Sequence, residues 1–282
     1  MSLRALVAMR RQSRRVGAAC LAAAVFFSMS ASAWSSEQFP DASSEDPAAV
    51  AEAISSIRDR DAAWVGEPIN PEGVGQTALS GGTVDVPSSG GEGVTFTDAE
   101  GESVRIGLPE VAESQEAEVL DGGTVVFPGE ESASAVIVTD HGAQMLTEIA
   151  DGAAPTRYSY EIDLQDDQHL ELVDDGAVVV DGDGSVTLAA GSAWATDAEG
   201  RSVPTWYETD GSTLVQVVDH ASAEDVSYPV VADPIWLAPW MIKCLVGIGL
   251  AGPQISAIAS MGNPASILAA FGRGAFACVV GR

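Results

Sequence analysis

Three histidines, His141, His169 and His220, are the side chains best suited to bind a metal ion or to transfer a proton near neutral pH. Their spacing matches no metal-ligand pattern, and two of them directly follow an aspartate in contexts typical of surface turns. Gly191–Ala193 contains a serine but lacks the Gly-x-Ser-x-Gly elbow of a hydrolase nucleophile. We therefore predict no catalytic residue, no metal site and no cofactor, and we do not expect an enzyme.

Asp181–Ser185 begins like an EF-hand loop, in which carboxylates coordinate Ca²⁺. Counting from Asp181, the position that requires glycine holds Val186, and the position that requires a bidentate glutamate holds Ser192. A hairpin turn explains the segment better, because Asp and Gly are typical turn residues. The adjacent aspartate pairs of the chain are interpreted in the same way: Asp166 with Asp167, and Asp174 with Asp175.

The N-terminus has the features of an export signal. Five arginines precede the apolar run Val16–Met29, and an Ala-Ser-Ala cleavage site follows it. We predict that residues 1–33 are a signal peptide cut between Ala33 and Trp34, so that Cys20 leaves with it. The paired arginines before the run resemble a twin-arginine signal, but the residues after them favour ordinary secretion. The alternative is a retained anchor, for which the apolar run is short.

The composition is strongly acidic. The chain of 282 residues has 41 Asp and Glu against 13 Lys and Arg, and all the acidic residues follow the predicted cleavage site. Of the basic residues 8 do so, which gives the mature chain a net charge of −33. This charge repels nucleic acid and anionic membrane surfaces, so we expect no nucleic-acid partner. Binding of divalent cations stays open, although a solvated acidic surface needs no such ligand.

Residues 34–75 are rich in Ser, Asp, Glu and Pro and are predicted to form an acidic, flexible linker. One short helix is expected within them. Asp46 would be its N-cap, a proline would take the first helical position, and Val50, Ile54 and Ile57 would share one face. Because this apolar stripe is narrow, the helix needs a surface to pack on.

From residue 76 to residue 234 the pattern is one of strands and turns, and it repeats. Leu79–Pro87 reappears 41 positions later as Leu120–Pro128, and Thr97–Val104 matches Thr196–Val203 at seven of eight positions. Glycine allows the positive φ of tight turns, and the Val and Thr residues around it favour strands. We therefore predict a β-sandwich built from repeated hairpins over residues 76–234.

The strand pattern also assigns faces and edges. In Arg157–Leu164 polar and apolar residues alternate, which places both tyrosines on one face. Trp194, Trp206 and Tyr207 are predicted to be large core residues. A proline within Val226–Pro234 removes a backbone donor, so this stretch is expected to be an edge strand or the last strand before the chain leaves the sheet.

A family resemblance is carried by several segments of the β region. They are Ala154–Tyr160, Asp181–Ser185, Trp194–Gly200, Val203–Thr205 and the closing Tyr-Pro-Val-Val-Ala-Asp-Pro segment, Tyr228–Pro234. Together they resemble a family of uncharacterised secreted β-domain proteins of high-GC Gram-positive bacteria. The closing segment is also similar to one that precedes repeat regions in Rhs-type and wall-associated secreted proteins. The resemblance implies an extracellular β-domain of unknown activity and implies no catalytic residue.

Residues 235–282 are apolar and Gly-rich and contain no Asp or Glu. After signal removal Cys244 and Cys278 are the cysteines that remain, and such a pair in an exported chain usually forms a disulfide. We predict that this bridge closes a small helical hairpin. Its apolar surface is too large to stay exposed, and Lys243 argues against a simple membrane span. Packing on the β-domain is expected, with a second copy or a membrane as the alternatives.

Three functional hypotheses remain. The favoured one is a secreted, non-catalytic β-domain protein of the cell surface or the medium, which binds a surface or an unknown protein or cell-envelope partner and uses the apolar tail for docking or assembly. The alternative is an acidic carrier for a membrane-active, bacteriocin-like C-terminal peptide, so that membrane contact occurs through the tail alone. The third is an unrecognised hydrolase, which no motif supports.

Overall fold

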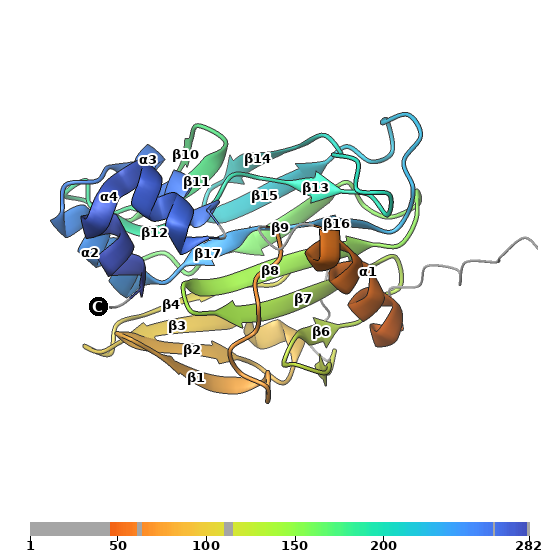
Figure 1. Ribbon diagram of the computed structural model, residues 1–282, viewed down its shortest axis with the longest axis horizontal. Coiled ribbons are helices and arrows are strands. Elements are labelled where there is room, and N and C mark those ends of the chain that lie inside the picture. Colours follow the sequence, from red (N-terminus) through yellow and green to blue (C-terminus); the bar gives the residue numbers. More distant parts are fainter. Residues whose placement is uncertain (1–45, 61–63, 110–114, 262, 281–282) are drawn as a thin grey trace, which may run out of the picture. The chain divides into compact units, whose positions relative to one another are not determined.

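The computed structural model describes residues 46–60, 64–109, 115–261 and 263–280. These residues form 17 strands in three antiparallel sheets, together with four α-helices, in a sandwich-like arrangement (Figure 1). The prediction of a mainly β fold followed by a small C-terminal helical part is confirmed.

The largest sheet has ten strands, and β10-β11-β12-β17-β8-β7-β6-β5 is its main order. Its strands are β5 (Glu118–Val119), β6 (Val125–Phe127), β7 (Ser132–Thr139), β8 (Gly142–Ile149), β10 (His169–Val173), β11 (Gly176–Val180), β12 (Val186–Ala190), β13 (Ala195–Thr196), β16 (Val230–Ala232) and β17 (Ile235–Leu237). The second sheet contains β1 (Gly75–Leu79), β2 (Gly82–Val86), β3 (Val94–Asp98) and β4 (Ser103–Ile106), and the third contains β9 (Arg157–Glu161), β14 (Thr205–Asp210) and β15 (Thr213–Val218).

The large sheet is covered on both faces. Strands β7 and β8 are buried along their whole lengths, and their successive side chains enter different cores. Val136 and Val138 join the core shared with the two smaller sheets, whereas Ala135 and Ile137 pack under helix α1 (Pro47–Arg60). This double burial explains why β7 reads as a continuous run of small and apolar residues.

Helix α1 begins as its sequence indicates. The side chain of Asp46 accepts a hydrogen bond from the backbone N–H of Ala48 at 2.9 Å, and Val50, Ile54 and Ile57 are buried. Because these three residues pack on the large sheet, this part of the expected linker belongs to the folded core. The first part of that linker lies outside the described residues.

The C-terminal part differs from a two-segment hairpin. Its first residues form β17, which pairs with β12 and β8, so the helical part begins only at Pro239. Three helices follow: α2 (Pro239–Gly247), α3 (Gly252–Ala259) and α4 (Pro264–Val280), the last of which is kinked at Gly272. A proline lies at or next to the start of each helix, where a backbone N–H would have no partner within the helix. These prolines divide the apolar sequence into three helices. Apolar side chains of these helices pack against β11, β12 and β17.

The closing segment is not at an edge. Strand β16 pairs with β13 on one side and β8 on the other, and the chain then continues into β17 within the same sheet. Pro229 can be accommodated because it lies just before the three-residue strand β16. No hydrogen bond between strands therefore requires a backbone N–H at this position. The prediction of an edge strand or a last strand is therefore wrong.

The two small sheets are joined to each other and, at one side, to the large sheet. A bridge between Ile106 and Ile162 connects β4 to the end of β9. The chain after β2 is hydrogen-bonded to the chain before β5, through Ala117 N–H to Ser88 O and Gly90 N–H to Gln115 O, both at 2.9 Å. At the opposite side β10 ends the large sheet and β14 ends the third sheet, and within the described residues no backbone hydrogen bond joins them. We call this place the open seam: β10, the turn that follows it at residues 174–175, and β14.

Candidate functional site

The three histidines are separated and have different surroundings. His220 is 1 % exposed, and its ring nitrogens lie 2.9 Å from the hydroxyl of Tyr228 and 3.0 Å from the carbonyl oxygen of Pro155. His220 was predicted to lie in a surface turn, and its burial shows that this prediction is wrong. The two polar partners compensate the ring nitrogens for the loss of water. His169 is exposed on β10, 2.7 Å from the carboxylate of Glu171. Within the described ranges no cluster of three or more His, Cys, Asp or Glu side chains is arranged to hold a metal ion.

The turn and disulfide predictions correspond to observed features. Asp181–Ser185 connects β11 to β12, and the backbone N–H of Asp181 donates to the carbonyl of Ser185 at 3.0 Å, as in a hairpin. Cys244 of α2 and Cys278 of α4 form a disulfide, with 5.5 Å between their Cα atoms. The predicted cleavage site at Ala33 and Trp34 lies outside the described part of the chain.

The repeated Thr-Asp-Ala-Glu-Gly segments form turns with the same hydrogen bonds. In the first, Oδ1 of Asp98 accepts from the backbone N–H groups two and four residues later, at 3.0 and 2.9 Å. In the second, Oδ1 of Asp197 accepts from the equivalent groups at 3.0 and 2.8 Å. Both carboxylates are buried, with side chains 2 % and 1 % exposed. Each therefore needs a further partner for its second oxygen.

The two turns obtain that partner differently. Oδ2 of Asp98 pairs with Nζ of Lys243 from helix α2 at 2.5 Å, and Glu102 pairs with the same ammonium at 3.0 Å. Oδ2 of Asp197 instead accepts from Nε of Arg201, at 2.8 Å, within its own turn. Burial alone would raise the pKa of Asp98, but hydrogen bonds from Lys243 and the backbone lower it below its usual value. The first turn is therefore a docking point for the C-terminal helices.

The closing segment contributes a buried carboxyl group. Asp233 is 1 % exposed and accepts a hydrogen bond from the backbone N–H of Trp194 at 3.0 Å. Burial raises the pKa of Asp233 well above its usual value, and burial together with this neighbour raises the pKa of Tyr160 and Tyr207. Through its hydrogen bond to Trp194, the Asp233 side chain fixes the β16–β17 junction inside the core.

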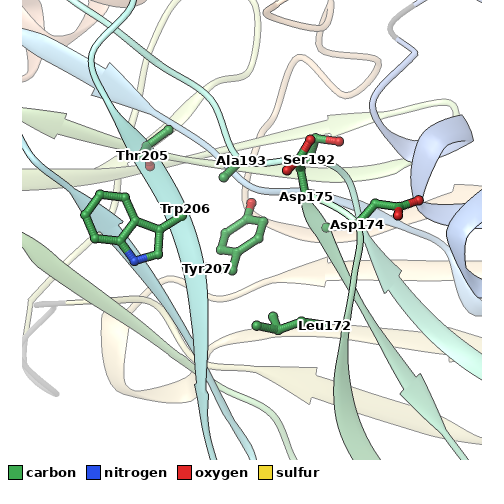
Figure 2. Close-up of a pocket in the computed structure, with 9 residues that line it drawn as sticks. Leu172, Asp174, Asp175, Ser192, Ala193, Thr205, Trp206 and Tyr207 are labelled. Atoms are coloured by element: carbon green, nitrogen blue, oxygen red, sulfur yellow. The ribbon is translucent and has the colours of Figure 1, made fainter.

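The open seam contains a cavity of about 350 Å³ between the edge strands of two sheets (Figure 2). Side chains and backbone of both strands and of one loop line it. The lining residues are Leu172, Asp174, Asp175, Gly176, Ser192, Ala193, Thr205, Trp206 and Tyr207. No sequence motif indicated this place, because it arises where two separately formed sheets end.

The side chains at the seam alternate between its interior and solvent. The ring of Tyr207 lies between the two strands with its hydroxyl directed toward Ala193, whereas the ring of Trp206 lies on the other side of β14 (Figure 2). Tyr207 is 6 % exposed, as predicted for a core residue, but Trp206 is 44 % exposed, so its prediction was wrong. Adjacent strand residues face opposite ways, and the outer face of β14 is open to solvent. Leu172 on β10 is also 46 % exposed.

Asp174 and Asp175 form the acidic rim of the seam. Both are exposed, and within the described residues no salt bridge or side-chain hydrogen bond is formed by either carboxylate. Asp174 has a positive φ of 49°, which Asp tolerates in tight turns. The rim therefore presents two hydrogen-bond acceptors with negative charge next to an exposed leucine.

A second cavity, of about 280 Å³, lies where the C-terminal helices meet β17 and the loop after α1. Ile69, Ile235, Ile258 and Met261 give it aliphatic walls, and His141 gives it a polar one. Burial lowers the pKa of His141 despite the opposing effect of the neighbouring aspartate. Unlike the open seam, this cavity is not flanked by two sheet ends, so the seam is the stronger candidate for binding.

Comparisons with known proteins add no family to these observations. A scan against protein-family models gives no match for the chain, and neither does a comparison with curated proteins. Among the described residues, no helix combines the length and the apolar character that crossing a membrane requires.

Proposed function

We propose that this chain is an exported, non-catalytic β-domain protein that binds a protein or another component of the cell envelope through its open seam. The observation that carries the proposal is the seam itself, where two sheets end beside a cavity of about 350 Å³ without a backbone bond between them. Exposed Leu172 and Trp206 flank this cavity. Exposed apolar groups beside unpaired strand edges are typical of interaction sites.

The charge of the chain supports the choice of partner. A mature charge of −33 attracts cationic groups and repels nucleic acid and anionic polymers. The two carboxylates of the rim also favour a cationic partner at short range, because a partner that covers them must supply hydrogen-bond donors or positive charge. A basic or neutral component of an envelope meets this requirement.

The C-terminal helices support a docking role over that of a membrane-active peptide. Ile242, Leu245, Ile255 and Ile258 are buried, and the cluster they belong to includes residues of β11, β12 and β17. Lys243 is held by the first acidic turn. Releasing the helices would expose this apolar area to water, so we propose that they complete the fold and do not act as a separate peptide.

Two matched variants test the proposal. Leu172→Lys places a charge at the seam, and Ile248→Lys makes the same change in the turn after α2, at a residue with a similar exposure of 48 %. The mature protein and both variants are incubated with envelope fragments of the producing cells and sedimented. We expect Leu172→Lys to lose co-sedimentation and Ile248→Lys to keep it. Loss with Ile248→Lys alone would assign binding to the tail, and equal retention of both would refute the seam.

A further inference from the structure

We infer that the open seam binds an extended, basic segment of its partner, which adds a strand to β14, places an apolar side chain in the cavity and directs positive charge toward the acidic rim. This inference rests on the proposed function and names the chemistry of the partner. Three observations carry it: the free edge of β14, the cavity beside that edge and the unpaired carboxylates of Asp174 and Asp175.

The edge of β14 is suited to strand addition. Its six residues, Thr205–Asp210, pair with β15 in one continuous register, without the register shift that interrupts β11 and β12. The stretch contains no proline, and within the described residues β14 has no second strand neighbour. Its outward backbone N–H and C=O groups form no strand pairing there, but β10 lies beside this edge with Cα atoms of the two strands within 8 Å, so an added strand would displace β10 as it pairs with β14. Strand β10, the other side of the seam, is shorter and carries the hydrogen-bonded His169–Glu171 pair.

The cavity would receive every second side chain of the added strand. Side chains of a strand alternate, so one set would project toward Tyr207 and Leu172 while the other would lie beside the exposed ring of Trp206. A volume of about 350 Å³ equals the share of roughly ten water molecules, which is room for large apolar side chains. Covering Leu172 would also remove from water an apolar side chain that is now 46 % exposed.

The rim selects the charge of the partner. Asp174 and Asp175 follow β10 directly and stand at the mouth of the cavity (Figure 2). Neither has a cationic partner within the described residues. A lysine or arginine in the added strand would supply that partner, whereas an acidic segment would be repelled by the rim and by the whole chain.

The test uses three synthetic ten-residue peptides and the full mature chain. One peptide alternates valine with lysine, the second alternates valine with glutamate, and the third is the first with two central valines replaced by proline. Isothermal titration gives the dissociation constants, and hydrogen exchange followed by mass spectrometry or NMR reports on the amides of Thr205–Asp210. We expect the valine–lysine peptide to bind and to slow this exchange, and the other two to bind at least tenfold more weakly.

Matched variants separate the rim from the general acidity of the chain. Asp174→Asn with Asp175→Asn removes two charges at the seam, and asparagine tolerates the positive φ at the first position. Asp166→Asn with Asp167→Asn removes two exposed charges before the other end of β10. We expect the rim variant to weaken peptide binding roughly three- to tenfold and the control variant to leave it unchanged.

The outcomes distinguish this inference from the proposed function. Equal binding of the proline peptide, unchanged exchange at β14, or equal effects of the two aspartate variants would overturn strand addition even if Leu172→Lys abolishes envelope binding. If the peptide binds the seam as expected but Leu172→Lys keeps envelope binding, the proposed function fails instead.

Discussion

Lys243→Met should destabilise the protein, because it removes the cationic partner of a buried carboxylate in the first acidic turn. Asp98 has a side chain that is 2 % exposed, and its Oδ2 would lose a charged partner at 2.5 Å. Oδ1 keeps its two backbone hydrogen bonds at 3.0 and 2.9 Å, and the ammonium is half exposed, so the loss stays well below that of a fully buried pair. We expect a decrease of about 1–2 kcal/mol in the free energy of unfolding.

Denaturant and thermal unfolding of the chain from Trp34 onward measure this loss. A decrease of this size lowers the melting temperature of a chain this long by about 2–8 °C. The pH dependence follows from the pKa of Asp98, which is lower in the folded protein than its usual 3.8. The stability that this group contributes is therefore complete above pH 3.8 and is lost as the pH falls through the folded pKa. The difference between Lys243→Met and the native chain should shrink over the same range.

The second turn provides the rescue. Arg201 stands where the first turn has Glu102, and its Nε reaches the equivalent carboxylate oxygen at 2.8 Å. Adding Glu102→Arg to Lys243→Met should therefore restore most of the lost stability, whereas Glu102→Gln in the same background should restore little. A loss below about 0.5 kcal/mol for Lys243→Met, or equal stability of the two double variants, would refute the assignment of the turn as an ion-pair docking point.

Three further predictions concern the disulfide, the buried acid and the N-terminus. Replacing Cys244 and Cys278 by serine should cost about 4 kcal/mol in denaturant unfolding, since the bridge closes a loop with a sequence separation of 34; an unchanged midpoint would contradict it. Because the pKa of Asp233 is raised above 3.8, its ionisation favours unfolding as the pH rises, so Asp233→Asn should gain stability relative to the native chain as the pH rises above about 4; a constant difference would count against the raised pKa. Mass spectrometry of exported protein should find Trp34 first, and an intact N-terminus would exclude cleavage after Ala33.

Local patterns were sufficient for the elements that depend on nearby residues. The helix after Asp46 and the buried tyrosines of β9 follow from capping and from period-two alternation. Alternation also places Trp206 and Tyr207 on opposite faces of β14. Both were predicted to lie in the core, but the outer face of this terminal strand is open to solvent, and Trp206 lies on it. The sequence does not show which strands end a sheet, because that depends on pairing between distant segments. Here β17 enters beside β8, more than eighty residues away in the chain.

The position at which the two repeated turns differ says more about the packing of the tail than the positions at which they match. The matched residues Asp98 and Asp197 make the same backbone bonds, as any two copies of a turn would. The mismatch of Glu102 with Arg201 decides whether the turn supplies its own cation or binds Lys243 of the tail. A lone lysine in an apolar tail and an unmatched glutamate in a repeated turn are thus complementary signals, and their pairing could have been anticipated before any contact was known.

Residues of the closing segment, Tyr228–Pro234, make contacts that hold the fold together. Tyr228 contacts buried His220, Asp233 fixes Trp194, and the carbonyl of Pro234 accepts from the backbone N–H of Met145 at 2.9 Å. These contacts hold a strand junction in the middle of the large sheet. Chains with a similar segment are therefore expected to share this junction, whereas Leu172 and the acidic rim of the open seam lie outside it. Resemblance in the closing segment thus informs the fold, and differences at the seam would be expected to set the partner.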